Sequence, residues 1–281
     1  MTEPPGGVRR GTTLSGVPDL TSTANPRVKG LVRLRTRRHR DAAGVTLIEG
    51  HDELALALDA GVRPTEVYWA PDLVRDAALL ERMTGARAFS VSREVFARIA
   101  YRESPDGWLA VAPAPGRPLD ALVLRPDALV LVAEGVEKPG NVGAMLRSAE
   151  AFGADAVVIA SADRAGTDFA NPNVVRASKG TVFAVPVASA STPAVRDWLR
   201  RNGFRTVVTT PAGAGELGRT DLTGPSALVI GTEATGVTDD WLTGADATVV
   251  IPMHGTVNSL NASVAAAVVL FEAVRQRTSV S

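Results

Sequence analysis

Three stretches in the second half of the chain are rich in apolar and β-branched residues without a regular alternation with charged ones, and they constrain the fold more than any other feature. They read FRTVVTT (204–210), SALVIGTE (226–233) and ATVVIPM (247–253). A strand with one face in water alternates apolar and polar residues, whereas a strand that is covered on both faces does not. Strands of the second kind occur mainly in parallel sheets with helices on both faces. The second half is therefore predicted to be an α/β domain with a parallel sheet.

The rest of this half alternates strand and helix patterns. Pro193 near the start of one expected helix and Gly203 at its end are typical of helix boundaries. Strands are expected at 128–136, 155–161 and 184–189, and helices at 141–154, 173–183 and 192–203.

The chain ends in a further expected helix, which follows the polar stretch Asn258-Ser259-Leu260-Asn261. Small residues, NASVAAAVV, open this helix, and they would allow close packing. Apolar residues repeat along one side of it, as in an amphipathic helix. This stripe consists of Leu260, Val264, Val268, Phe271 and Val274.

The first half predicts a smaller α/β unit, in which three strands alternate with three helices. One of these helices is expected at residues 71–86. A Gly-, Pro-, Thr- and Ser-rich start predicts a disordered tail, and a Pro-rich segment predicts a linker between two domains. The expected organisation is a tail (1–20), a first domain (21–112), a linker (113–122) and a second domain (123–281).

The composition is that of a soluble globular protein, with 281 residues, 45% hydrophobic and 21% charged. The chain has no cysteine, which excludes disulfides, thiolate metal sites and cysteine nucleophiles. Its histidines, His39, His51 and His254, are not at metal-ligand spacing, so no metal is expected. There is no signal-peptide core and no apolar run that could span a bilayer, so a cytoplasmic protein without a membrane partner is expected.

One stretch concentrates positive charge, although the formal net charge of the chain is zero. Residues 25–40, NPRVKGLVRLRTRRHR, contain several Lys and Arg residues and no acid. The absence of acidic partners at helical spacing favours contacts with nucleic-acid phosphates over a solvated helix face. The residues predicted to bind RNA here are Arg27, Lys29, Arg33, Arg35, Arg37 and Arg38.

Several loops that follow expected strands contain glycine, as phosphate and cofactor motifs do. Gly135 and Gly140 have the spacing of a P-loop, but Asn141 and Val142 stand where that motif needs Lys and Ser/Thr. IGTEATG (230–236) lacks the G-x-G-x-x-G spacing of a dinucleotide site. Neither nucleoside-triphosphate hydrolysis nor dinucleotide binding is expected. The loops that remain as ligand sites are 137–147, 230–237 and 251–261.

These loops, EKPGNVGAMLR, IGTEATGV and IPMHGTVNSLN, resemble the three signature motifs of the SpoU family of RNA ribose 2′-O-methyltransferases, in the SPOUT superfamily. NPNVVRASKGTVFAVPV (171–187) is similar to a fourth stretch of the family. More weakly, the first domain resembles the family's substrate-binding module, akin to a ribosomal-protein RNA-binding fold. The resemblance implies a deep trefoil knot in the parallel-sheet domain, S-adenosylmethionine as cofactor, and a homodimer formed through the C-terminal domain.

The resemblance also implies roles for single residues. Arg147 matches the family's catalytic arginine. Because arginine stays protonated in proteins, we expect its guanidinium to grip the target phosphate and stabilise charge on the 2′-oxygen, not to act as a base. Taken alone, Arg147 would be an ordinary exposed helix residue. The other residues placed in the active site are Asn141, Glu233, Ser259 and Asn261, and helix capping is a compatible role for Asn141, Ser259 and Asn261.

Backbone around the cofactor is expected from Gly231, Ile251 and Leu260, with Thr210 and Met253 as weaker candidates for the cavity wall. Tight turns and core packing would explain these residues equally well. Arg176, Ser178 and Lys179 resemble a phosphate-contacting loop, which in related dimers completes the neighbouring site.

The expected function is S-adenosylmethionine-dependent 2′-O-methylation of a ribose in structured RNA, with 23S-type ribosomal RNA favoured over transfer RNA. Three alternatives stay open at this point. The first is a transfer-RNA ribose methyltransferase, and the second is a non-catalytic RNA-binding or ribosome-assembly protein on the same scaffold. The third, methylation of a base, is disfavoured by the third motif.

Overall fold

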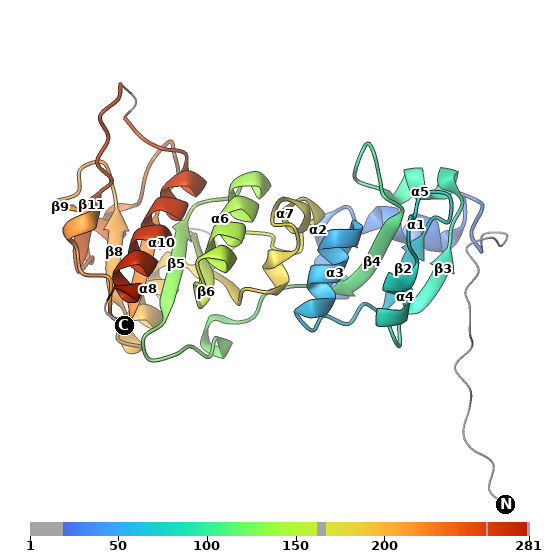
Figure 1. Cartoon of the computed structure of the whole chain (residues 1–281), viewed down its shortest axis with the longest axis horizontal. Coiled ribbons are helices and arrows are strands. Elements are labelled where there is room, and N and C mark those ends of the chain that lie inside the picture. The colour runs from blue at the N-terminus through green and yellow to red at the C-terminus, as the bar shows by residue number, and fades with distance from the viewer. Residues whose placement is uncertain (1–18, 162–166, 257, 280–281) are drawn as a thin grey trace, which may run out of the picture.

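The computed structural model describes residues 19–161, 167–256 and 258–279, and its two sheets lie side by side along the long axis (Figure 1). Most of the expected tail, residues 1–18, lies outside the described residues. Its last two residues are anchored, contrary to the expectation. The backbone N–H of Asp19 donates to Ser90 Oγ at 2.9 Å, and Leu20 forms a parallel bridge with Val91.

The C-terminal sheet has seven strands in the order β7-β6-β5-β10-β8-β11-β9, and its neighbouring strands are all parallel. The central strand β10 (Ser226–Ile230) pairs with β5 (Leu129–Glu134) on one side and with β8 (Arg205–Thr209) on the other. The predicted parallel sheet is confirmed. The remaining strands are β6 (Ala156–Ser161), β7 (Val187–Ser191), β9 (Gly215–Glu216) and β11 (Ala247–Val250). The short strand β9 was not expected.

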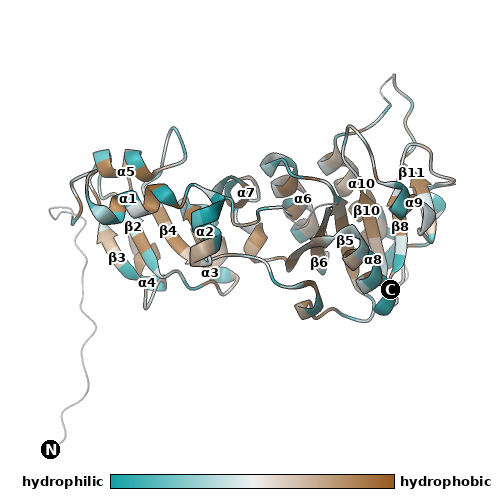
Figure 2. Ribbon diagram, turned by 180° about the vertical axis from the view of Figure 1, so that it is seen from behind, coloured by the Kyte–Doolittle hydropathy of each residue, from teal (hydrophilic) through white to brown (hydrophobic). Residues whose placement is uncertain are grey.

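Helices bury both faces of this sheet, which is why its strands show no alternation. Leu129 and Leu131 of β5 belong to the core cluster on the side of α6 (Pro139–Ala151) and α10 (Ala262–Thr278). Their neighbours Val130 and Val132 belong to the opposite cluster, with α8 (Thr192–Arg201) and α9 (Asp239–Thr243). The strand β10 is accordingly one of the most hydrophobic ribbons of the domain (Figure 2).

The N-terminal sheet has the order β1-β4-β2-β3, with β2 and β3 parallel and the other pairs antiparallel. One face is covered by α1 (Pro26–Arg33) and α5 (Arg93–Ile99), and the other by α3 (His51–Asp59) and α4 (Ala78–Arg82). The strands are β1 (Val45–Glu49), β2 (Glu66–Trp69), β3 (Arg87–Ser90) and β4 (Trp108–Pro113), and α2 (Arg37–Ala43) precedes β1.

Two expected helices are shorter than the sequence suggested. The helix expected at 71–86 is limited to α4, because the preceding residues form turns and the side chain of Asp76 accepts from the backbone N–H of Ala78. The helix expected at 173–183 ends as α7 (Pro172–Ala177). A turn at Lys179, with φ of 51°, then leads into the 3-10 helix η2 (Thr181–Phe183).

The apolar stripe expected on α10 is only partly buried: Leu260, Val268 and Val274 pack against the edge of the core. Val264 and Phe271 are 48% and 55% exposed. The residues that pack into the core are mostly alanines, and they let the helix lie close to the sheet and to α6. They are Ala262, Ala265, Ala266, Val269, Leu270 and Ala273.

The two domains meet through α7 and the segment before it. Arg40 on α2 is 2% exposed and forms an ion pair with Asp168. The hydroxyl of Thr46 on β1 donates to the carbonyl of Ala170 at 2.7 Å. The expected linker packs on the C-terminal domain, where Leu122 is buried in its core. These contacts make the domain junction a packed interface.

Candidate active site

A cavity of about 590 Å³ opens at the carboxyl ends of β8, β10 and β11. It is lined by the residues that follow these strands and by the polar stretch before α10. Parallel sheets bind ligands at this edge, because the loops that follow neighbouring strands meet there. The wall of this one cavity includes each of the residues expected to hold the cofactor, which are Thr210, Gly231, Ile251, Met253 and Leu260.

The loop after β10 forms a tight turn in the cavity wall. Thr232 and Gly236 exchange two backbone hydrogen bonds, each of 3.0 Å. A Cβ on Gly231 would lie 2.1 Å from the carbonyl carbon of Gly236, so only glycine fits there. This glycine therefore serves the close approach of two backbone segments, whatever the cavity holds.

Three of the residues placed in the active site form one hydrogen-bonded network. The Nδ2 group of Asn141 donates to Glu233 Oε1 at 3.0 Å. Asn261 Nδ2 donates to the same carboxylate oxygen, and also to Asn141 Oδ1 at 3.3 Å. The network joins the first turn of α6, the loop after β10 and the start of α10.

The same network caps α10. Asn261 is the N-cap residue, and its Oδ1 accepts from the backbone N–H of Ser263 at 3.0 Å. Glu233 Oε1 also accepts from the backbone N–H of Ala262 at 3.3 Å. A carboxylate at the N-terminus of a helix is stabilised by the unpaired N–H groups there. Asn261 thus acts as a cap and also belongs to the network.

Ser259 and Arg147 stand apart from this network. Ser259 is exposed and lines the cavity. Arg147 lies on the exposed side of α6, and among the described residues we find no hydrogen bond or ion pair of its guanidinium. An unpaired guanidinium on the helix that also carries Asn141 is free to bind an anion from outside the chain.

The loop after α7 is only partly available to a ligand. Arg176 and Lys179 are exposed. Ser178 is fully buried, and its hydroxyl donates to the carbonyl of Val175 at 2.9 Å, so in this chain it stabilises the turn and contacts no phosphate. The turn packs tightly on α6, because a Cβ on Gly143 would lie 2.4 Å from Ala177 Cβ.

The basic run of the first domain is divided between internal contacts and the surface. Arg27 pairs with Glu66 at 2.7 Å and stacks over Phe89, and its hydrogen bond with Tyr68 raises the pKa of its guanidinium. Arg35 donates to the carbonyl of Ala100 at 2.7 Å. These two arginines, which the sequence suggested as RNA ligands, are engaged within the domain.

The run also has acidic partners that the sequence argument did not count. Arg37 lies 3.4 Å from Asp41, four residues later, and Arg40 pairs with Asp168 of the other domain. Asp41 lies just beyond the stretch considered, and Asp168 is distant in sequence. The prediction that this stretch has no acidic partners is therefore wrong for Arg37 and Arg40.

Two cations of the run line a surface hollow of about 410 Å³. Lys29 and Arg33 of α1 line it together with Arg98 of α5, and all three are exposed. Sequence reasoning missed Arg98, because it lies in an otherwise ordinary amphipathic helix far from the basic run. The packing of α1 beside α5 on one sheet face brings Arg98 close to Lys29 and Arg33, and this packing is not visible in the sequence.

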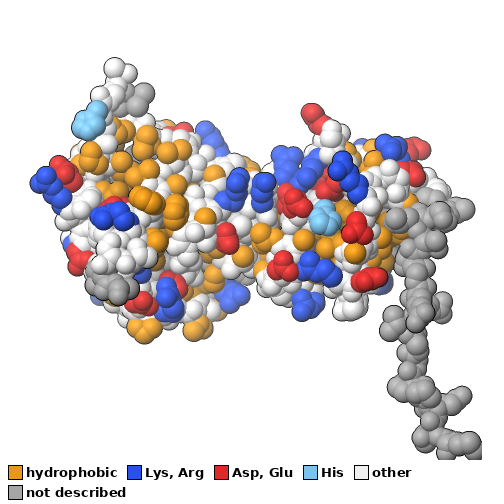
Figure 3. All heavy atoms as spheres, in the orientation of Figure 1, with side chains coloured by type: hydrophobic (Ala, Val, Ile, Leu, Met, Phe, Trp, Pro, Cys, Tyr) orange, Lys and Arg blue, Asp and Glu red, His pale blue; other side chains and the backbone are white. Residues whose placement is uncertain are grey.

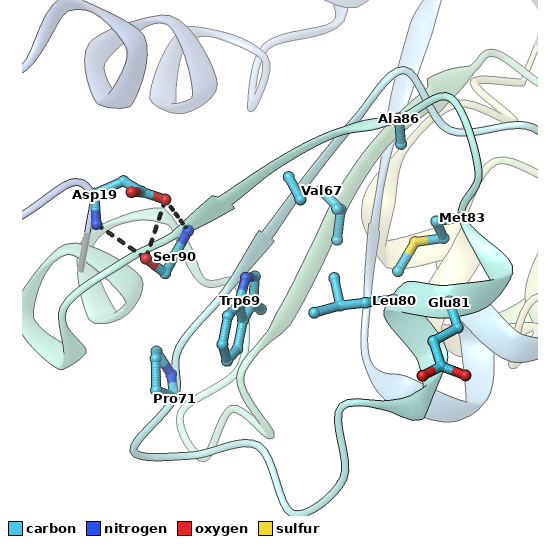
Figure 4. A pocket seen from close by; sticks show the side chains of 10 residues that line it. Asp19, Val67, Trp69, Pro71, Leu80, Glu81, Met83, Ala86 and Ser90 are labelled. Atoms are coloured by element: carbon cyan, nitrogen blue, oxygen red, sulfur yellow. Dashed lines mark hydrogen bonds between the residues drawn. The ribbon is translucent and has the colours of Figure 1, made fainter. Parts of the chain in front are cut away.

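A second hollow of the first domain, of about 450 Å³, lies between β2, β3 and α4 (Figure 4). Trp69, Leu80 and Met83 give it an apolar wall, and Asp19 and Ser90 are hydrogen-bonded at its rim. Its charged lining residues are the acids Asp19 and Glu81. It therefore offers less to a phosphate than the hollow between α1 and α5.

Within the described ranges, no group of His, Asp and Glu side chains is arranged to hold a metal ion. No helix in the described part of the chain is long and apolar enough to cross a membrane.

Two family models match the chain, and their boundaries correspond to the two sheets. Residues 128–271 match the SpoU rRNA methylase family, and residues 25–110 match the MRM3-like substrate binding domain.

Among curated proteins, the 23S rRNA (uridine(2479)-2′-O)-methyltransferase of Streptomyces viridochromogenes is 32% identical over 255 residues, which is 88% of each chain. The 23S rRNA (guanosine(2553)-2′-O)-methyltransferase RlmP of Bacillus subtilis is 30% identical and covers 90% of this chain and 97% of its own.

Solved structures agree over nearly the full length. A crystal structure of an RNA 2′-O ribose methyltransferase has a TM-score of 0.81 and 41% identity, with 92% of this chain and 99% of the other covered. An AdoMet-bound rRNA methyltransferase from Sinorhizobium meliloti has a TM-score of 0.80 and 28% identity, with 91% and 97% covered. The motif loops, the parallel sheet and these relatives agree, and the chain belongs to the SpoU rRNA methylase family.

Proposed function

We propose that this protein transfers a methyl group from S-adenosylmethionine to the 2′-hydroxyl of a ribose in 23S-type ribosomal RNA. The observation that carries the proposal is the Asn141–Glu233–Asn261 network, which joins side chains from each of the three family motifs and reaches the cavity through Glu233. The curated relatives that cover most of the chain are named as 23S rRNA 2′-O-methyltransferases.

The cavity fits a nucleoside-sized cofactor. Its volume of about 590 Å³ lies within the roughly 300–1,000 Å³ that small-molecule sites occupy. Its lining combines apolar side chains such as Ile230 and Leu260 with the backbone of tight loops, a combination that suits a base and a thioether-like chain. When bound, S-adenosylmethionine supplies an activated methyl group. Thr210, Gly231, Ile251, Met253 and Leu260 are the residues that would hold it.

The donor leaves as S-adenosylhomocysteine and the proton of the 2′-hydroxyl passes to solvent water, so this chain must place the acceptor oxygen and stabilise the charge that develops on it. Arg147 is the group we assign to the target phosphate and to the charge that develops on the 2′-oxygen, because a guanidinium keeps its proton and pairs well with phosphate. Asn141 and Asn261 are held by Glu233, which lines the cavity. We assign them, together with Ser259, to orientation of the ribose.

RNA contacts are proposed for the exposed cations of both domains. Figure 3 shows Lys and Arg side chains from the domain junction across the upper part of the N-terminal domain. The cations that we propose are Lys29, Arg33, Arg37, Arg38, Arg98, Arg176 and Lys179. Arg27 and Arg35 contribute to this surface mainly by supporting its shape, because each is engaged in contacts within the domain.

A homodimer through α10 would cover an apolar face that a single chain leaves open. Val264 and Phe271 are exposed on this helix. Hydrophobic side chains gather on the surface of this domain around α10 (Figure 3). Sedimentation at micromolar concentration tests the dimer, and a monomer under these conditions would contradict it.

We also propose the trefoil knot of the family for the C-terminal domain, and a cytoplasmic location.

The activity is tested by incubating the protein with S-adenosylmethionine labelled in its methyl group and with total RNA, ribosomal RNA or transfer RNA. Label in alkali-resistant dinucleotides of ribosomal RNA is the expected result, because a 2′-O-methyl group blocks alkaline cleavage at that position. Label in transfer RNA alone would mean that the substrate is transfer RNA and not ribosomal RNA. Binding to RNA without transfer to any of the three would favour a non-catalytic protein.

A further inference from the structure

A buried carboxylate lies beside the cavity, although it does not line it. Glu134 is the last residue of β5 and is 4% exposed. Nothing in the sequence singles it out, because it ends an apolar strand just before the first motif loop. A buried carboxylate is costly unless its oxygens accept hydrogen bonds, so its partners indicate what it is there to hold.

Both oxygens of Glu134 have partners from two other segments. Oε2 accepts from the backbone N–H of Thr238 at 2.7 Å. Oε1 accepts from the hydroxyl of Thr238 at 2.8 Å and from that of Thr192 at 3.0 Å. Thr238 is the N-cap residue of α9, and Thr192 is the first residue of α8. One side chain therefore ties the end of β5 to the starts of two helices.

The segment that ends at Thr238 is the cavity wall itself. Residues 230–237 line the cavity without interruption. They leave β10 at Gly231, turn back through the paired backbone groups of Thr232 and Gly236, and then reach Thr238. Gly135, which follows the strand, also lies close to this loop, because a Cβ there would lie 3.1 Å from Thr232 Cγ2.

We propose that Glu134 is a positioning residue, which holds the loop 230–238 in the shape that forms the wall of the methyl-donor cavity. The loop is anchored at its entrance by β10 and at its exit by the two hydrogen bonds from Thr238 to this carboxylate, which Thr192 of α8 also contacts. Without the exit anchor, the loop must be ordered by the ligand, and that cost weakens binding. This inference rests on the proposed function, because it assumes that the cavity binds S-adenosylmethionine.

The hydrogen-bond pattern predicts different effects for different substitutions. Glu134→Gln can keep all three bonds, since its carbonyl can accept from the N–H of Thr238 while its amide donates to the two hydroxyls. Glu134→Ala removes the carboxylate that holds the N–H and the hydroxyl of Thr238. Thr238→Val removes one bond of the three, is less disruptive, and serves as the second variant if Glu134→Ala does not fold.

The experiment measures the Kd for S-adenosylmethionine by calorimetry and the Kd for ribosomal RNA by filter binding, on the full chain. We expect Glu134→Ala to raise the Kd for the donor by about tenfold or more, and Thr238→Val by about threefold, while RNA affinity stays within about twofold. Glu134→Gln should stay within about threefold of the parent protein. Thr46→Val is the matched control, because it also removes a buried hydrogen bond but lies at the domain junction.

A Kd for the donor that is unchanged in folded Glu134→Ala, or in Thr238→Val, would overturn the inference. An equal loss of donor affinity in Thr46→Val would overturn it as well, because the effect would then reflect general destabilisation. If the parent protein itself fails to bind S-adenosylmethionine, it is the proposed function that fails. That outcome is distinct from normal binding by all variants.

Discussion

The basic run of α1 and α2 and the rim of the cavity are polar regions built in opposite ways. The basic residues are neighbours in sequence, and the fold separates them into internal contacts and surface groups. Asn141, Glu233 and Asn261 are far apart in sequence, and the fold brings them into hydrogen-bond contact. Closeness in sequence therefore says little about a shared role, whereas position at the ends of parallel strands says much.

Arg147 is the residue for which this comparison predicts the largest effect. Arg147→Ala should abolish methyl transfer, with a loss of at least about a hundredfold, because it removes a charge from the developing transition state. The Kd for S-adenosylmethionine should change little, since Arg147 is not among the residues that line the cavity. Single-turnover transfer and calorimetry on the same preparation check both statements.

Arg196, a half-buried arginine of α8, provides the matched control for that experiment. Arg196→Ala should keep transfer within about threefold. If Arg147→Ala lost donor binding together with transfer, Arg147 would have a structural role in α6, and our assignment of its guanidinium to the target phosphate would be wrong.

The ion pair between Arg40 and Asp168 predicts an intermediate effect, on stability. Asp168→Ala leaves the guanidinium of Arg40 buried with no acidic partner. Breaking such a pair costs about 3 kcal/mol of unfolding free energy, near the lower end of the usual range because Asp168 is partly exposed. Urea unfolding measures this cost. Asp41→Ala, at an exposed pair, should cost less than about 1 kcal/mol. Equal costs would show that the domain junction is not a packed interface.

The smallest effect is expected for the exposed cations that line the hollow between α1 and α5. Their replacement tests whether the surface residues of the basic run, and not its internally paired ones, bind RNA. Replacing Lys29, Arg33 and Arg98 by Ala should weaken RNA binding by about tenfold and reduce the salt dependence of the affinity, because fewer counterions are released. Filter binding at several salt concentrations measures both quantities.

Arg27→Ala is the control for this triple variant. It removes one positive charge from the same domain, but also an ion pair with Glu66 and a stacking contact with Phe89. It should lower the free energy of unfolding and leave the salt dependence of the RNA affinity nearly unchanged. A salt dependence reduced as much by Arg27→Ala as by the triple variant would mean that internal and surface arginines bind RNA alike.

Much of the fold could be predicted from local patterns. Apolar runs such as 226–233 identified strands that are buried on both faces, because the pattern reflects burial, which a single segment records. Boundary residues such as Gly203 also carry local information, because glycine tolerates positive φ, here 71°. The motif loops identified the family and the residues of the network, although not how those residues bond.

The sequence by itself determined the parallel sheet, most of its strands and the loops that hold the site, because these follow from burial patterns and residue types within short segments. Only the tertiary structure decided which arginines are engaged internally, which side of α10 is buried, and that Glu134 anchors Thr238, a residue 104 positions later in the chain. The reason is physical. A side chain's partner depends on which distant segments the fold brings within about 3 Å of it, and no local pattern encodes that distance.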